Sequence, residues 1–176
     1  MSEEIDVIKK SIVDTKVTFT LNPKFWEDFD QNMKKSLYSS FQWNEIKFLD
    51  ENKELHKNIN NVPTDFGGIY LFVAKPNILS DAHYYLLYVG RARKTNNQNL
   101  RKRCKEYFNE IKKEKRPLIH RMLNTWGDYL YIRYIPLADN DEINRIEAEL
   151  INRLLPPFNY EIPDKKIRDA VKAFSI

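Results

Sequence analysis

The sequence predicts an α/β protein, and three observations support this fold class. Residues 68–74 and 84–90 have strand character, and the loop between them contains Pro, Asn, Ser and Asp, which suits a surface connection. Amphipathic stretches of helical period follow at residues 100–115 and 142–155. Between them, residues 129–137, "YLYIRYIPL", form another strand candidate. The 176 residues suggest one domain, or one domain with an elaboration.

Composition indicates a soluble globular protein, with 42% hydrophobic and 31% charged residues. No apolar run approaches the ~20 residues that a membrane span needs, and the charged N-terminus lacks the apolar core of a secretion signal. Cys104 is the single cysteine, which excludes an intramolecular disulfide and a Cys-based zinc cluster. We therefore expect an intracellular, cytoplasmic protein with no membrane partner.

Positive charge is concentrated in one segment of the chain. The formal net charge is +4, but Arg91 to Arg121 contains twelve Lys or Arg against three acidic residues. The remaining residues carry more acids than bases. Such a segment is typical of a protein that binds a polyanion, nucleic acid first, and the alternative is a solvated helix face.

The elements before the main strands are less regular. Residues 15–21, "TKVTFTL", alternate apolar and polar side chains and predict a strand. An Asn-Pro pair then predicts a capped helix start, and apolar side chains follow at helical spacing over residues 25–37. Residues 41–49, "FQWNEIKFL", are ambiguous. The polar segment 50–68 ends in turn residues and marks the main boundary.

Residues 1–66 are therefore expected to form an N-terminal strand–helix elaboration. They carry more aromatic surface than one short helix needs, in Phe25, Trp26, Phe29, Phe41 and Trp43. We expect this surface to pack on the core, to form a homodimer contact, or to contact DNA.

The later helices have recognisable ends. An apolar stripe runs along residues 100–111, and a proline opens a second helix at residues 117–126. Asp139 and Glu142 fit a capping box before the helix at 142–155, which two consecutive prolines stop.

Glu147 is the most informative residue of that helix, because it falls near the middle of its apolar face. Glu149, two residues on, is expected to point outward. Burying a carboxylate without a partner is costly, so Glu147 needs an arginine, a lysine, a donor network or a metal. The structural alternative is a salt bridge at the edge of the core.

Arg103 has a milder form of the same property. It lies at the edge of its helix's apolar stripe beside Tyr107, while Lys102 and Lys105 face away. One interpretation is a guanidinium positioned for a phosphate, and the alternative is an arginine that extends along the core edge.

Together these residues resemble the GIY-YIG nuclease family. The resemblance rests on Gly68-Ile69-Tyr70, Tyr88-Val89-Gly90, Arg103, Glu147 and Asn159. The matched region, residues 67–160, is also similar to the nuclease domain of the excision-repair incision subunit, whereas the chain after Asn159 is more like stand-alone and restriction-like members. Val89 stands where the motif has isoleucine, and Arg91 where repair-type domains have lysine.

The resemblance implies a small antiparallel three-stranded sheet flanked by helices. In the family this sheet presents both tyrosines, the arginine and the glutamate in a shallow cleft. Residues 67–160 would form the nuclease core, and residues 161–176 a C-terminal helical tail.

The implied activity is metal-dependent endonucleolytic hydrolysis of DNA phosphodiester bonds. Glu147 would hold Mg²⁺ (or Mn²⁺), with water and substrate oxygens completing the coordination. Arg103 would bind the scissile phosphate, and Tyr70 or Tyr88 would take a proton from the attacking water. Asn159 would orient groups near the metal.

The implied partner is DNA, most simply double-stranded. The expected nucleic-acid-binding residues are Arg91, Arg93, Lys102, Lys105 and Tyr107, and the first two are also candidates for favouring a phenolate. The biological setting would be restriction, phage defence, a mobile element or repair. Two alternatives are a non-catalytic nucleic-acid-binding module with the same fold and a nuclease that cleaves RNA.

Overall fold

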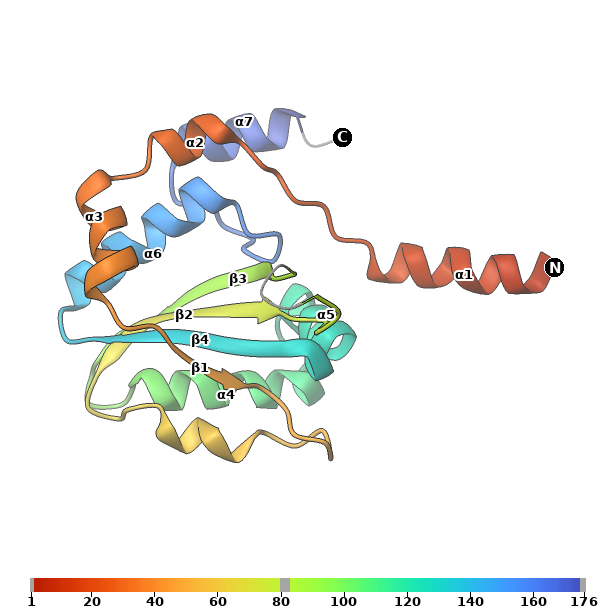
Figure 1. Cartoon of the computed structure of the whole chain (residues 1–176), viewed down its shortest axis with the longest axis horizontal. Coiled ribbons are helices and arrows are strands. Elements are labelled where there is room, and N and C mark those ends of the chain that lie inside the picture. Colours follow the sequence, from red (N-terminus) through yellow and green to blue (C-terminus); the bar gives the residue numbers. More distant parts are fainter. Residues whose placement is uncertain (1, 80–82, 175–176) are drawn as a thin grey trace.

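The computed structural model describes residues 2–79 and 83–174 and has the predicted α/β architecture. In the described part of the chain, one antiparallel sheet has the strand order β1-β4-β2-β3, and helices cover both faces (Figure 1). The strands are β1 (Asn44–Lys47), β2 (Gly67–Ala74), β3 (Tyr85–Ala92) and β4 (Leu130–Leu137). The helices are α1 (Ser2–Thr15), α2 (Pro23–Glu27), α3 (Gln31–Lys35), α4 (Leu100–Lys113), α5 (Pro117–Trp126), α6 (Asn140–Leu154) and α7 (Lys165–Phe174). A π-helical turn lies at Ser36–Ser40, and 3-10 helices lie at Lys57–Asn61 and Gly127–Tyr129.

The sheet has four strands, so the prediction of a three-stranded sheet was wrong by one strand. The additional strand is β1, which pairs with β4 so that Ile46 lies opposite Ile132. Because β1 has only four residues, of which Ile46 alone is buried, no period could be recognised in its sequence. Its partner β4 is eight residues long and supplies the open edge on which so short a strand can form.

Residues 15–21 do not form the predicted strand. Thr15 ends α1, and the following residues carry no strand pairing. Val17 and Phe19 instead pack against the core, and the Phe19 ring centroid lies 5.8 Å from that of Tyr85. The alternating pattern therefore arises because Val17 and Phe19 pack against the core from one side of an extended segment that pairs with no strand.

The helix expected after the Asn-Pro pair is broken in two. It begins as predicted, because Asn22 Oδ1 accepts from the Lys24 amide at 3.0 Å. A second cap then interrupts it, since Asp30 Oδ1 accepts from the Met33 amide at 2.7 Å and starts α3. Phe29 and Met33 are buried in a cluster with apolar residues of α6, so part of the N-terminal segment packs on the core.

Two hydrophobic clusters lie on opposite faces of the sheet. Side chains alternate along β2, so Tyr70 and Phe72 join the cluster that includes residues of α4 and α5, whereas Ile69 and Leu71 face the cluster that includes α6. Since β2 lies between β3 and β4, it is buried on both faces and has the continuous apolar sequence of a central strand.

The two helices that carry Arg103 and Glu147 begin and end close to the predicted positions. Asn99 caps α4, and Asp139 caps α6 with its Oδ1 accepting from the Asp141 amide at 2.9 Å. At the other end of α6, Leu155 takes a left-handed conformation before the two prolines. These ends fix which side chains face the sheet.

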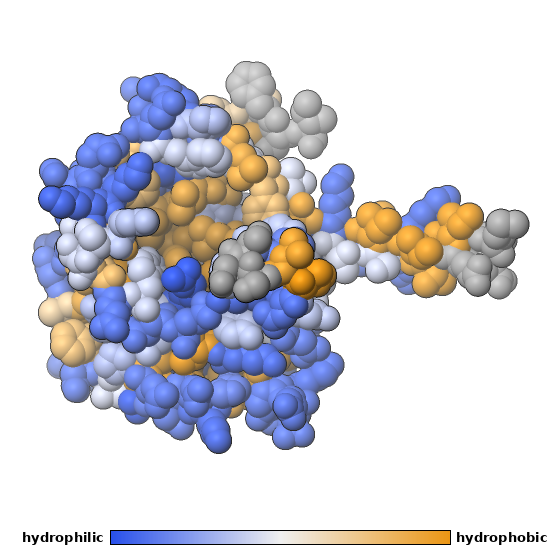
Figure 2. All heavy atoms as spheres, in the orientation of Figure 1, coloured by the Kyte–Doolittle hydropathy of each residue, from blue (hydrophilic) through white to orange (hydrophobic). Residues whose placement is uncertain are grey.

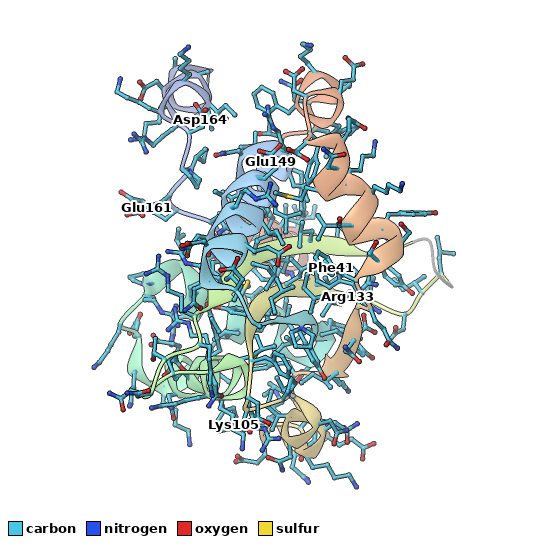
Figure 3. The ribbon with its side chains drawn as sticks, turned by 90° about the vertical axis from the view of Figure 1, so that its left-hand side faces the viewer. Phe41, Lys105, Arg133, Glu149, Glu161 and Asp164 are labelled. Atoms are coloured by element: carbon cyan, nitrogen blue, oxygen red, sulfur yellow. The ribbon has the colours of Figure 1, made fainter. Side chains whose placement is uncertain are left out.

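Glu149 corrects one detail, because it does not point outward as predicted. Its Oε1 accepts hydrogen bonds from the Asp30 amide and from Arg153 Nε, both at 3.0 Å. The N-terminal helices lie beside α6 and cover it at this point (Figures 1 and 3). The periodicity of α6 alone could not reveal this second layer.

Helix α1 extends away from the body of the protein (Figure 1). Its apolar side chains are exposed, as Figure 2 shows, and they are Ile5, Val7, Ile8, Ile12 and Val13. Among the described residues, no helix has both the length and the apolar character needed to cross a membrane.

Candidate active site

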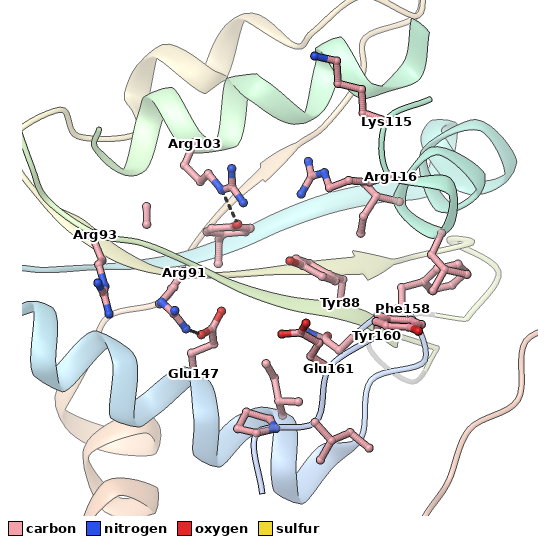
Figure 4. Close-up of a pocket in the computed structure, with 18 of the residues that line it drawn as sticks. Tyr88, Arg91, Arg93, Arg103, Lys115, Arg116, Glu147, Phe158, Tyr160 and Glu161 are labelled. Atoms are coloured by element: carbon pink, nitrogen blue, oxygen red, sulfur yellow. Dashed lines mark hydrogen bonds and ion pairs between the residues drawn. The ribbon is translucent and has the colours of Figure 1, made fainter. Parts of the chain in front are cut away.

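A cleft of about 1300 Å³ lies along β3, between α4 on one face of the sheet and α6 on the other (Figure 4). All five residues that the sequence predicted to be catalytic line this cleft: Tyr70, Tyr88, Arg103, Glu147 and Asn159. They come from β2, β3, α4, α6 and the loop after α6. The fold therefore brings together residues that are widely separated in the sequence.

On the α4 face, a guanidinium and two phenols form one hydrogen-bonded group. Arg103 Nε donates to the Tyr70 hydroxyl at 3.3 Å, and the Tyr70 and Tyr107 hydroxyl oxygens are 2.8 Å apart. Because the Tyr70 oxygen accepts from Arg103, its own proton is free to be donated to Tyr107. Arg103 Nη1 also lies 2.9 Å from Glu106 Oε2, so two partners fix the guanidinium at the cleft wall.

Gly90 and Gly68 explain why glycine accompanies tyrosine on both strands. Gly90 lies directly opposite Tyr70, and a Cβ at Gly90 would come within 2.5 Å of the Tyr70 Cζ and hydroxyl oxygen. The Tyr70 ring thus lies across the glycine backbone. Gly68 has a φ of 151°, and a Cβ there would lie 2.1 Å from the Ile135 carbonyl oxygen. One glycine makes room for the phenol, and the other allows the start of β2 to lie against β4.

We expect Gly90→Ala to destabilise the protein by about 1–3 kcal/mol, because the new methyl group displaces the Tyr70 ring and its hydrogen bonds. Urea unfolding measures this difference. Gly127→Ala is the matched control, since the nearest atom to its Cβ is the movable Leu49 Cδ1 at 3.0 Å. Equal midpoints for the two variants would contradict the role given to Gly90.

Both cleft tyrosines are held in the neutral form. Burial, followed by the neighbouring Tyr107 and Tyr88 phenols, raises the pKa of Tyr70 well above its usual value, against the opposing effect of Arg103. Burial and Tyr107 likewise raise the pKa of Tyr88. For Arg103, burial lowers the pKa, but the adjacent Tyr70 and Tyr107 outweigh it and the pKa is raised. Near neutral pH the group is therefore two phenols beside a permanent cation.

On the α6 face, Glu147 forms an ion pair with Arg91 of β3. The Glu147 side chain is only 12% exposed, as its place on the apolar face of the helix predicted, while Arg91 is 39% exposed. The core-edge salt bridge that the sequence left open is thus present. Both residues also line the cleft, so the carboxylate and its partner face the same cavity.

Asn159 satisfies the backbone of β3 at its outer edge. Its Oδ1 accepts from the Val89 amide and its Nδ2 donates to the Val89 carbonyl oxygen, both at 2.8 Å. The Phe158 amide adds a hydrogen bond to the Leu87 carbonyl oxygen at 3.0 Å. Asn159 therefore anchors the loop after α6 to β3.

Three of the expected nucleic-acid-binding residues lie outside the lining of the cleft. Lys102 Nζ donates to the Asn97 carbonyl oxygen at 2.6 Å, and Lys105 Nζ donates to Asn60 Oδ1 at 2.9 Å. Figure 3 shows Lys105 at the end of the molecule away from Glu149 and Asp164. Tyr107 is fully buried and is hydrogen-bonded to the Tyr70 hydroxyl.

The cations that face the phenols are not the ones expected. Arg93 does line the cleft, but its Nε donates to Asn144 Oδ1 at 3.0 Å, and Arg91 pairs with Glu147. Arg103 and Arg116 take that place, and the Arg116 guanidinium lies 4.6 Å from the Tyr107 ring centroid.

Sequence reasoning missed four charged residues of the cleft lining: Lys115, Arg116, Glu161 and Arg168. Two of them belong to the cationic segment between Arg91 and Arg121, which was the available signal. Figure 4 places Lys115 and Arg116 on the same side of β3 as Arg103. No local pattern distinguishes Arg168 from the other cations of the terminal helix.

The described residues contain no group of three or more His, Cys, Asp or Glu that could hold a metal, and Glu147 is one of the two carboxylates in the cleft lining. Mg²⁺ keeps several waters and commonly binds one or two carboxylates together with substrate phosphate oxygens. A single carboxylate facing an open cleft fits that mode. Arg91 would then compete with the metal for the same oxygens.

The sequence has a distant, partial similarity to a protein with a curated name. It is 29% identical over 121 residues to UvrABC system protein C of Wolinella succinogenes. The match covers 66% of this chain but only 17% of that protein. No family model and no solved structure matches the chain.

Proposed function

We propose that this protein is a metal-dependent endonuclease of the GIY-YIG type that hydrolyses DNA phosphodiester bonds. The observation that carries the proposal is that the five motif residues all line one cationic cleft. The similarity to UvrABC system protein C, the incision subunit that has a GIY-YIG nuclease domain, agrees with it. The sequence similarity does not depend on the charge distribution, and the cationic segment between Arg91 and Arg121 separately favours a polyanion.

Arg103 binds a non-bridging oxygen of the scissile phosphate in this proposal. Its Nε and Nη1 are already engaged with Tyr70 and Glu106, which fixes the plane of the guanidinium before substrate arrives. Such preorganisation favours the transition state, where negative charge on the phosphate oxygens is greatest. Arg116 lies close to the same phenols and adds positive charge.

Glu147 would hold a divalent cation, which when bound supplies charge neutralisation at the phosphate and the leaving oxygen. Arg91 holds the carboxylate in position in the absence of substrate. On DNA binding, Arg91 is free to turn toward a phosphate, since it is partly exposed.

Tyr88 is the better placed of the two tyrosines for a proton transfer to or from water. Both phenols contact Tyr107, but the Tyr70 hydroxyl is buried and also accepts from Arg103, whereas Tyr88 is partly exposed in the cleft. Its raised pKa means that it begins as a phenol, so it first donates a hydrogen bond to the attacking water or phosphate. Acceptance of a proton requires the additional positive charge that enters with the substrate complex.

The direct test is nicking of supercoiled plasmid DNA by the full chain with Mg²⁺ or with EDTA. We expect nicked and linear products with Mg²⁺ or Mn²⁺ and none with EDTA. Glu147→Ala, purified in parallel, controls for a contaminating nuclease and should be inactive. Equal products from parent and variant, or none from either, would contradict the proposal, and cleavage of RNA in place of DNA would support the RNA alternative.

A second candidate is a nucleic-acid-binding module without catalysis. The ion pair between Arg91 and Glu147 favours it, because the carboxylate already has a partner. In this case the full chain would bind DNA but would leave the plasmid intact with Mg²⁺, with Mn²⁺ and with EDTA.

A further inference from the structure

Tyr160 is an exposed aromatic residue at the lining of the cleft that none of the proposed chemistry uses. It is 85% exposed and immediately follows Asn159. Figure 4 shows it beside Glu161 on the loop after α6, on the far side of β3 from Arg103 and Arg116. A large aromatic surface left in water is a candidate contact surface for a flat ligand.

The backbone that carries Tyr160 is fixed on both sides. Before it, Phe158 and Asn159 make three hydrogen bonds to the backbone of β3. After it, Arg168 Nη1 donates to the Ile162 carbonyl oxygen at 3.0 Å. The ring is therefore presented by an ordered loop, and little backbone entropy remains to be lost when a ligand binds.

The charge around Tyr160 suits a nucleic acid strand. The cleft lining includes six cations and two carboxylates: Arg91, Arg93, Arg103, Lys115, Arg116 and Arg168 against Glu147 and Glu161. Cationic grooves with exposed aromatic rings are the common design for single strands, because cations hold the phosphates while each base stacks on a ring. Within a duplex, by contrast, both faces of every internal base are already stacked.

We propose that Tyr160 is a stacking platform for an unpaired base next to the phosphate that is cleaved. The substrate class would then be DNA with an unpaired segment, such as a bubble, a flap or a single-stranded end, in preference to a continuous duplex. This inference rests on the proposed nuclease function, because it assigns the strand that enters the same cleft.

The test uses the full chain in EDTA, so that binding is measured without cleavage. The probes are a duplex with a central unpaired bubble and a fully paired duplex of the same length, each with one 2-aminopurine at the centre. Stacking should quench the 2-aminopurine fluorescence of the bubble probe. Tyr160→Ala should weaken bubble binding about 5- to 150-fold and remove that quenching, while Tyr160→Phe should retain both.

Tyr38→Ala is the matched control, because Tyr38 is 92% exposed and lies outside the cleft lining. It should bind both probes as the parent does. If Tyr160→Ala binds the bubble like the parent, or weakens both probes equally, the stacking role is wrong although the protein still binds DNA. If the parent binds neither probe, the proposed nuclease function fails, and this inference fails with it.

Discussion

Arg103→Ala is expected to lower the rate of DNA cleavage by at least about 10²- to 10³-fold while the protein remains folded. The removed guanidinium is the group held by Tyr70 and Glu106 at the wall of the cleft, and its side chain is only 32% exposed. Loss of one preorganised donor to a developing charge has an effect of this size. Single-turnover cleavage of a labelled duplex or bubble measures the rate, and the melting temperature of each variant shows whether the protein remains folded.

The fold should tolerate Arg103→Ala because its partners keep other contacts. Tyr70 remains hydrogen-bonded to Tyr107, and Glu106 still accepts from Gln98 Nε2 at 2.9 Å. Arg103→Lys should also cleave slowly. A lysine ammonium lacks the planar set of donors with which a guanidinium can bind Tyr70, Glu106 and a phosphate at the same time.

Lys112→Ala is the matched control for charge, because Lys112 lies in the last turn of the same helix, is exposed, and is absent from the cleft lining. It should cleave within a factor of a few of the parent. Cleavage by Arg103→Ala at the rate of Lys112→Ala would remove Arg103 from the mechanism.

The positions of Tyr70, Arg103 and Glu147 could be predicted, because each lies on a regular strand or helix. Tyr70 lies on a strand whose alternation sets its face, and Arg103 and Glu147 lie on helices whose apolar stripes face the sheet. The capping residues Asn99 and Asp139 then fix the register of each helix end. In these segments, local preference and tertiary packing agree.

Contacts between distant segments could not be predicted in the same way. Strand β1 is too short to show a period, and its formation depends on the free edge of β4. Likewise, no pattern within α6 indicates that Asp30 would cover Glu149, or that Arg91 would be the cation that reaches Glu147. Which charges meet across elements depends on the packed geometry, so a single sequence can show that Glu147 needs a partner without showing which one.

Glu147→Gln is the second variant with a large expected effect, and it separates a metal ligand from a structural salt bridge. The substitution keeps the shape of the side chain but removes the negative charge that faces Arg91 and the cleft. If Glu147 holds the cation, cleavage should fall by about 10²- to 10³-fold or more. DNA binding without metal should persist or strengthen, because repulsion between the carboxylate and phosphate is lost.

Glu149→Gln is the matched control, two residues away on the same helix. It weakens the hydrogen bonds to the Asp30 amide and Arg153, so its melting temperature should fall while cleavage stays near the parental rate. Glu147→Gln should instead lose cleavage and keep a melting temperature near that of the parent. Its partner Arg91 is partly exposed, so the guanidinium can be solvated when the ion pair is lost. Melting temperature and cleavage rate, measured for both variants, should therefore change in opposite ways for Glu147→Gln and Glu149→Gln.

The competition between Arg91 and a metal ion provides a readout that does not depend on cleavage. Any ligand that binds only the folded state raises the melting temperature, and at a fixed concentration a tighter ligand raises it more. Mg²⁺ should therefore stabilise the parent slightly, stabilise Arg91→Gln more because the carboxylate is no longer occupied, and leave Glu147→Gln unchanged. If Mg²⁺ has the same effect on all three proteins and Glu147→Gln cleaves at the parental rate, then Glu147 serves only to pair with Arg91, and the metal ligand must be sought elsewhere.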